Sequence, residues 1–280
     1  MAAALTLLSV RQAVSNFLEG YAGSQQDDAR LLEQSVAGPR LREWVRWIKV
    51  QNDNRTGTVE GRTVIRSIEV LGPHGTAGDQ YLMQVDAIVH FTATEPGAKP
   101  QTIDRQVLGQ ALVARTASGG WGVADIIRDG QQLRLQIHTL PPTIVTSSHG
   151  LTVRAKSVFI FGTTWVVNLV VDNRSATPLL AVPKLIWIRS GKVVAKAQSL
   201  DERLENPVPS GQRVLTQITA APGDSVPVQA LLQIAFLTPQ RGLLKGQLFL
   251  PFGPQGTPGG PTGPSGASGA TGGSGPTGAS

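Results

Sequence analysis

Helical periodicity is confined to the first fifty residues, and this limit constrains the fold more than any other feature of the chain. One apolar stripe at helical spacing consists of Val10, Val14, Phe17, Leu18 and Tyr21. A second apolar set, Leu31, Leu32 and Val36, ends at Gly38-Pro39. Pro39 suits the first position of a helix, because its missing N–H needs no partner there. The third stripe consists of Leu41, Trp44, Val45 and Ile48. The pattern therefore predicts three short helices.

The sequence after the helices alternates as β-strands do. Strands are predicted over residues 58–71, 81–94, 102–115 and 121–127, separated by turns rich in Gly, Pro, Asn and Asp. Apolar residues occupy every second position from Tyr81 to Phe91, so this set is expected to face the helices. Helices followed by an antiparallel meander predict an α+β domain over residues 1–135.

A family resemblance narrows this prediction. The segment Ala29 to Leu41, read as Ala-Arg-Leu-Leu-Glu-Gln-Ser-Val-Ala-Gly-Pro-Arg-Leu, resembles the second and third helices of bacterial cone-shaped domains. Residues 9–130 are similar in pattern to the domain shared by nuclear transport factor, ketosteroid isomerase and scytalone dehydratase. The resemblance implies three helices on a curved antiparallel sheet. Since this fold hosts enzymes, pocket binders and scaffolds, it leaves the function open.

The inner-membrane assembly component of type IV secretion and conjugation machines also resembles this domain. That family implies an N-terminal membrane helix. No segment of this sequence reaches the roughly 18 apolar residues that a membrane helix needs. The apolar run Met1 to Val10 has neither a preceding basic region nor a clear cleavage site. We therefore expect either a cytoplasmic protein or a bacterial envelope protein whose leader or anchor lies upstream of this sequence.

The second half of the chain carries only strand and turn signals. Residues 136–149 contain Leu140-Pro141-Pro142 and are predicted to be an extended linker. About seven strands are expected in residues 150–252, which predicts an all-β immunoglobulin-like sandwich. The segment Trp165 to Ser175 resembles the second-strand region of bacterial immunoglobulin-like envelope domains. The chain has no cysteine, so an antibody-type disulfide is excluded.

Residues 253–280 contain only Gly, Pro, Ser, Thr, Ala and one Gln. Four triplets starting at Gly260 resemble bacterial collagen-like repeats, in which only glycine fits at the axis of three chains. Four triplets are too few for an independent triple helix. We therefore predict a disordered low-complexity tail.

The positive charge of the chain is unevenly distributed. Residues 1–135 carry 14 Lys/Arg and 14 Asp/Glu, whereas residues 136–252 carry 11 and 5, which accounts for the whole formal charge of +6. Such a surface favours an anionic membrane, an acidic polymer or nucleic acid, although it can also serve solubility alone. The candidate residues for an anionic-partner surface are Lys184, Lys192, Lys196, Arg213 and Lys245.

Catalytic and metal-binding signals are weak. Asp86 and His90 lie four residues apart on one predicted strand, so they share a face, but that face is opposite the apolar one. The other histidines, His74, His138 and His149, lack metal-ligand spacing. Without cysteine, thiolate nucleophiles and Cys-ligated zinc are excluded. We predict no catalytic residue, no cofactor and no metal site.

Two further motifs have ordinary explanations. The triplets at Asn54 and Asn173 match the glycosylation pattern, which often occurs by chance. Trp44 and Trp47 among basic residues suggest stacking on nucleic acid, but Trp44 belongs to the apolar stripe. Nucleic acid is therefore not expected as the partner.

Two functions remain open at this point. The first is a non-enzymatic interaction or scaffold protein, which binds other proteins or itself, in a bacterial envelope or conjugation and secretion assembly. The alternative is a small-ligand binder or an enzyme with a pocket in the first domain. The residues expected to line such a pocket are Tyr21, Trp44, Met83 and Phe91. A convergent acid or histidine would favour the pocket, whereas closure by apolar side chains would favour the scaffold.

Overall fold

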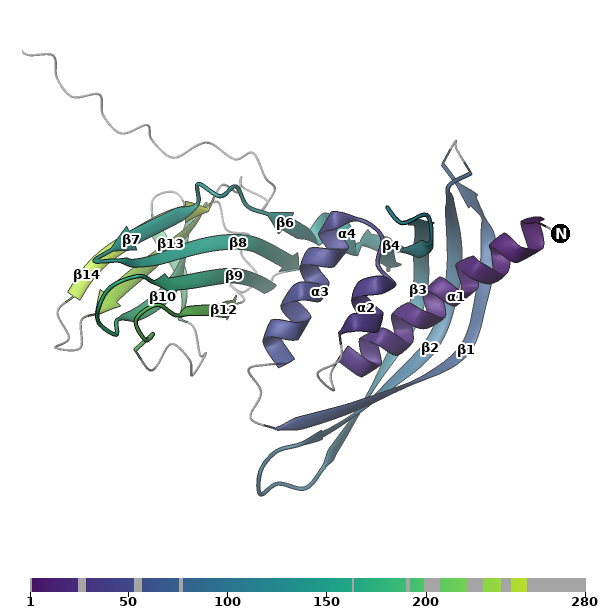
Figure 1. Cartoon of the computed structure of the whole chain (residues 1–280), viewed down its shortest axis with the longest axis horizontal. Coiled ribbons are helices and arrows are strands. Elements are labelled where there is room, and N and C mark those ends of the chain that lie inside the picture. The colour runs from purple at the N-terminus through teal and green to yellow at the C-terminus, as the bar shows by residue number, and fades with distance from the viewer. Residues whose placement is uncertain are drawn as a thin grey trace, which may run out of the picture.

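The structure is a computed structural model with helices and antiparallel sheets, in which strands predominate (Figure 1). It describes residues 2–24, 29–52, 57–75, 78–162, 164–189, 192–198, 207–220, 229–237 and 243–250. Within this range, only the backbone is described for residues 2–3, 52, 182–189, 192–198, 220, 229–237 and 243–250. The predicted tail, residues 253–280, lies outside the described residues.

The three predicted helices are present. They are α1 (Ala2–Gly23), α2 (Arg30–Gln34) and α3 (Pro39–Asn52). The stripe of α1 is buried at Val10, Val14, Phe17 and Leu18, and Pro39 opens α3 as predicted. The α1 helix begins earlier than the stripe, and its first turns leave Leu5 and Leu8 exposed. None of the described helices is both long and apolar enough to span a membrane.

Five antiparallel strands form the first sheet, in the order β1-β2-β3-β4-β5. Their bounds are Thr58–His74, Gln80–Thr94, Gln101–Arg115, Trp121–Arg128 and Gln131–Gln132. The alternation predicted for β2 is confirmed, because Met83, Val85, Ala87 and Val89 are buried and the residues between them are partly exposed. The helices cover this apolar face, and α1 contacts four of the strands (Figure 1).

Gly61 explains how closely α1 approaches the sheet. A Cβ atom at this position would collide with the carbonyl oxygen of Ala22 at the end of α1. Two residues further along β1, the Thr63 hydroxyl donates a hydrogen bond of 3.0 Å to the carbonyl oxygen of Leu18. Glycine is therefore required where the helix backbone lies directly on the strand, and β1 continues through it without ending.

The second half of the chain forms two antiparallel sheets. The second sheet has the order β12-β9-β8-β6, with β7 also paired to β8, and the third sheet has the order β11-β10-β13-β14. The bounds in chain order are β6 Ile137–Thr139, β7 Val145–Ser148, β8 Leu151–Phe161, β9 Thr164–Asn173, β10 Leu180–Arg189, β11 Lys192–Gln198, β12 Arg213–Ala220, β13 Gln229–Leu237 and β14 Leu243–Leu250. Ala181 of β10 packs in one core cluster with Val153 and Val171 of the second sheet.

The prediction of an extended linker over residues 136–149 is corrected by the structure. After the short helix α4 (Leu133–Gln136), the strands β6 and β7 both pair with β8. Only the Pro-Pro stretch between them lacks regular structure, since proline cannot donate to a strand ladder. The segment is thus part of the second sheet.

The hydrophobic core also crosses the predicted boundary. The cluster that contains Val14 and Met83 of the first domain includes Ile137, Phe159 and Val166 of the second sheet. These three side chains are at most 6% exposed. One cluster therefore extends across the predicted boundary, and residues 150–252 also contain a cluster of their own that includes Val153, Leu169 and Ile218.

Candidate functional site

Helix α3 lies between the first and second sheets and is buried on two faces. One face carries Leu41, Val45 and Ile48, as the sequence predicted. A second face carries Trp47 and Val50, which are 2% and 5% exposed. The helix contacts β6 and β12 (Figure 1). We use the term junction for α3, α4 and the strands of the second sheet that contact them.

A chain of hydrogen bonds joins α3 to the second sheet. Glu43 Oε1 accepts hydrogen bonds from Trp47 Nε1 at 2.8 Å and from the Ser157 hydroxyl at 3.0 Å. The Ser157 oxygen accepts from Asn168 Nδ2 at 2.9 Å, and Asn168 Oδ1 accepts from Gln217 Nε2 at 2.6 Å. The chain therefore runs from α3 through β8 and β9 to β12. Ser157 and Asn168 are completely buried, so these bonds satisfy polar groups that water cannot reach.

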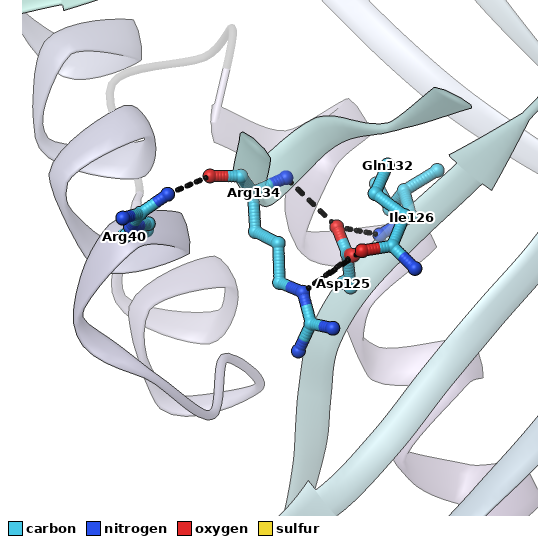
Figure 2. Close-up of polar contacts among 5 residues, drawn as sticks. All are labelled: Arg40, Asp125, Ile126, Gln132 and Arg134. Carbon is cyan, nitrogen blue, oxygen red and sulfur yellow. Dashed lines mark hydrogen bonds and ion pairs between the residues drawn. The ribbon is translucent and has the colours of Figure 1, made fainter. Parts of the chain in front are cut away.

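A buried carboxylate fixes the connection between the sheets (Figure 2). Asp125 of β4 is completely buried, and its Oδ1 accepts hydrogen bonds from the backbone N–H of Ile126 at 2.9 Å and of Arg134 at 2.8 Å. Its Oδ2 lies 3.1 Å from Nε of Arg134, which donates to Gln132 Oε1 at 3.2 Å. Arg40 of α3 donates a bond of 3.0 Å to the Arg134 carbonyl oxygen. We call this group the Asp125 clasp.

Burial dominates the electrostatics of the clasp. It raises the pKa of Asp125 above its ordinary value, and the two backbone N–H groups and the charge of Arg134 oppose the rise. Burial also lowers the pKa of His138 in β6, and the positive charge of Arg40 adds to this effect. A perturbed acid can mark a catalytic site. Because Asp125 is completely buried and accepts three interactions from the protein, this arrangement suits a structural role.

Three of the four residues predicted to line a pocket lie together: Tyr21 at the end of α1, Trp44 on α3 and Phe91 on β2. Tyr21 stacks on Trp44 and meets Phe91 edge to face, both with ring centroids 5.9 Å apart. Arg105 covers the Phe91 ring at 5.8 Å and donates a hydrogen bond of 3.4 Å to the Tyr21 hydroxyl. Met83 is completely buried in the main core cluster. The rings therefore contact one another, and the guanidinium of Arg105 is the cationic group beside them.

Asp86 and His90 project from the face of the first sheet that is opposite the helices, as predicted. His90 Nδ1 lies 2.6 Å from Asp104 Oδ1, and Arg66 lies 3.9 Å from Asp86. The described residues contain no group of three or more histidines and acids that could hold a metal ion. We find a pair of surface ion contacts at this place rather than a constellation of catalytic groups.

Of the five residues predicted to form an anionic-partner surface, only Arg213 has a described side chain. Arg213 donates a hydrogen bond of 2.8 Å to Asp172, and this bond holds the pKa of Asp172 below its usual range. The guanidinium is thus engaged within the chain, although it remains exposed. The side chains of Lys184, Lys192, Lys196 and Lys245 lie outside the described residues, so this surface stays a prediction.

Asn173 of the glycosylation triplet and Trp47 of the tryptophan pair both form hydrogen bonds within the protein. Asn173 is completely buried and donates both Nδ2 hydrogens, at 2.9 Å to the Thr177 carbonyl oxygen and at 2.7 Å to that of Val208. A glycan cannot be attached to an amide in this position. Trp47 is buried and donates to Glu43, so it cannot stack on a nucleic acid base. The triplet at Asn54 lies outside the described residues.

No protein-family model matches this sequence, and no curated protein is significantly similar to it. The junction must therefore be interpreted from its own geometry. Sequence reasoning missed it, although a signal was present. Trp47 and Val50 are apolar residues off the main stripe of α3, and a helix with a second apolar face is expected to be covered on both sides.

Proposed function

We propose that this chain is a non-enzymatic interaction or scaffold protein whose two halves act as one rigid body. The first half corresponds to a cone-shaped α+β domain and the second to an immunoglobulin-like sandwich. The single observation that carries the proposal is the double burial of α3, with the hydrogen-bond chain of Glu43 on one side and the Asp125 clasp beside it. Both acids bind groups of the protein itself: Glu43 binds Trp47 and Ser157, and Asp125 binds the backbone of Ile126 and Arg134.

A rigid junction is what a scaffold requires. If two binding surfaces are to be held at a fixed spacing, the segment between them must not rotate. Hydrogen bonds are directional, so a buried chain of them fixes the rotation and register of α3 more strictly than apolar contacts alone. The resemblances described above add that the setting is a bacterial envelope or a conjugation and secretion assembly, which belongs to the same proposal.

Rigidity can be measured directly, because the absence of cysteine lets spin labels be introduced at chosen sites. Ala117→Cys, in the turn between β3 and β4, and Gln212→Cys, beside the second sheet, are exposed positions. We expect pulsed electron paramagnetic resonance to give one narrow distance distribution. Glu43→Ala should broaden it, whereas Glu33→Ala at an exposed position of α2 should not. A broad distribution in the unmodified background would overturn the proposal.

The alternative, a small-ligand binder, is favoured by the aromatic cluster of Tyr21, Trp44 and Phe91, since two of its rings are only partly buried. Arg105 beside these rings would suit an aromatic anion. The probe is anilinonaphthalene sulfonate, which has this chemistry. Saturable one-to-one fluorescence that Arg105→Ala abolishes would favour the binder. Absence of saturable binding, together with a narrow distance distribution, would favour the scaffold.

A further inference from the structure

The face of the second sheet that α3 contacts carries a further row of residues beside the junction. The strands β7, β8, β9 and β12 contribute one residue each to this row (Figure 1). Val145 pairs in register with Arg154, and Arg154 pairs with Val170. Val170 in turn pairs with Leu215, and it lies two residues from Asn168 on β9, so the row shares the face of the hydrogen-bond chain. All four residues are partly exposed, and we call them the Arg154 row.

Arg154 is a partly buried cation between apolar neighbours. Its Nε atom is buried and has no hydrogen-bond partner among the residues that the structure describes. A buried donor without an acceptor is unfavourable, and an arginine cannot relieve this by losing its charge. The guanidinium therefore retains the capacity to bind an acceptor that another molecule supplies.

The acid on this face is already engaged by other arginines. Asp172 lies two residues beyond Val170 on β9, and its Oδ2 is 2.8 Å from Nη2 of Arg213 and 3.5 Å from Nη2 of Arg174. The hydrogen bond from Arg213 holds the pKa of Asp172 below its usual range, so this carboxylate is ionised and already bound. The described part of the face therefore has an excess of positive charge, which is complementary to an acidic group of a partner.

The neighbours of Arg154 indicate which acidic group fits. A carboxylate presents two oxygens that match the planar fork of a guanidinium. Val145 lies on one side of the arginine, and Val170 and Leu215 lie on the other, so the row suits an acid that stands between apolar side chains. At about 4.8 Å between strands the row is about 14 Å long, which corresponds to about four residues of an extended peptide.

We propose that the Arg154 row is a docking site for a peptide segment of another protein, in which a carboxylate side chain lies between apolar side chains. The guanidinium of Arg154 donates to both carboxylate oxygens, and the apolar residues of the row contact the apolar side chains of the segment. The inference rests on the proposed function, because it names the partner chemistry of an interaction protein. The row lies beside the junction, so a docked segment is held at a fixed place relative to both halves of the chain.

The probe is the blocked peptide acetyl-Leu-Glu-Leu-amide, titrated into the isotopically labelled full chain and followed by nuclear magnetic resonance at the Nε–Hε signal of Arg154. We expect saturable binding with a Kd of about 1–10 mM, because one ion pair and a few apolar contacts give a weak affinity. The matched control is acetyl-Leu-Gln-Leu-amide, which has the same shape without the charge. It should bind at least about tenfold more weakly, since it cannot form charge-assisted bonds.

Variants test whether the arginine fork itself is required. Arg154→Lys keeps the charge and loses the planar fork, so the affinity should fall about tenfold, and Arg154→Gln should abolish saturable binding. Arg213→Gln is the control on the same face, and it should change the affinity less than about threefold, because its exposed guanidinium is bound to Asp172. Backbone amide signals of β8 and β9 report binding to the variants, and circular dichroism verifies that each is folded.

Four results would overturn the inference. They are no saturable binding of the Glu peptide, equal affinity for the two peptides, an Arg213→Gln variant as weak as Arg154→Gln, and inorganic phosphate that binds more tightly than the Glu peptide. The last result would show a site for small anions instead. None of them bears on the rigidity of the junction, because the distance distribution between the spin labels tests the proposed function independently of any peptide.

Discussion

Replacing Glu43 by alanine tests the role of the junction at its centre. The carboxylate is the shared acceptor of Trp47 Nε1 and the Ser157 hydroxyl, which belong to α3 and to β8. Alanine removes the acceptor and leaves both donors in place. Trp47 is 2% exposed and Ser157 is completely buried, so each donor depends on the acceptor that Glu43 supplies.

The magnitude follows from the two orphaned donors. A buried polar group without a partner costs about 1–3 kcal/mol, so two of them give a loss of roughly 2–5 kcal/mol in the free energy of unfolding. The ion pair with Arg46, 3.7 Å long and largely exposed, adds almost nothing. Glu43→Gln keeps Oε1 as an acceptor and loses only its charge, so we expect about 1 kcal/mol or less.

The assay is equilibrium unfolding in urea, followed by tryptophan fluorescence and by far-ultraviolet circular dichroism. The two probes should give one transition, and the alanine variant should shift its midpoint without changing the slope. Ser157→Ala completes a double-mutant cycle with Glu43→Ala, and the two losses should not add, since they remove the same bond. A loss below about 0.5 kcal/mol for Glu43→Ala, or full additivity, would refute the reasoning.

Three further predictions follow. Because the pKa of Asp125 is raised, its protonated form favours the folded state at low pH. This contribution to stability is lost as the pH rises from about 3.9 through the folded-state pKa. In pH-dependent urea unfolding, the wild-type chain should therefore lose stability relative to Asp125→Asn over this window, and a constant difference would contradict the sign. Fragments 1–135 and 150–252 should each be less cooperative in thermal unfolding than the full chain, because each lacks part of the shared core; two cooperative fragments would show independent domains. His90→Gln should change stability by less than about 1 kcal/mol, because its partner Asp104 is 58% exposed and ion pairs reached by water contribute little, and a larger loss would show that this pair is shielded from water.

Local patterns were sufficient to predict most strands. The predicted limits of β2 and β4 agree with the observed ones to within a residue. The alternation of apolar and polar residues indicates which face of a strand is buried, and the flanking turn residues indicate where the strand ends. Both signals are local in the sequence. The same reasoning placed Asp86 and His90 on the face opposite the helices.

The junction could not be predicted in the same way, because its contacts join residues far apart in the chain. Glu43 and Ser157 are separated by 114 positions, and Asp125 holds the backbone of Arg134 through a turn that has no hydrophobic periodicity. The Pro-Pro stretch predicts a domain linker, but proline interrupts only the regular structure between β6 and β7, and one hydrophobic cluster includes residues on both sides of it. The local sequence around the Pro-Pro stretch does not show which distant segments pack together.

The buried polar groups of the junction also decide how the two sheets can be arranged. Phe159 and Val166 belong to the same cluster as the buried side chains of α3, and apolar contacts of this kind are not directional. A shift of α3 by one residue, however, would remove Glu43 from Ser157 and leave a completely buried hydroxyl without its acceptor. The cost of that loss, about 1–3 kcal/mol, adds to the preference for the observed register that the apolar faces of α3 already give. The apolar core therefore holds the two halves together, and the hydrogen bonds of Glu43, Ser157 and Asn168 set the angle at which they are held.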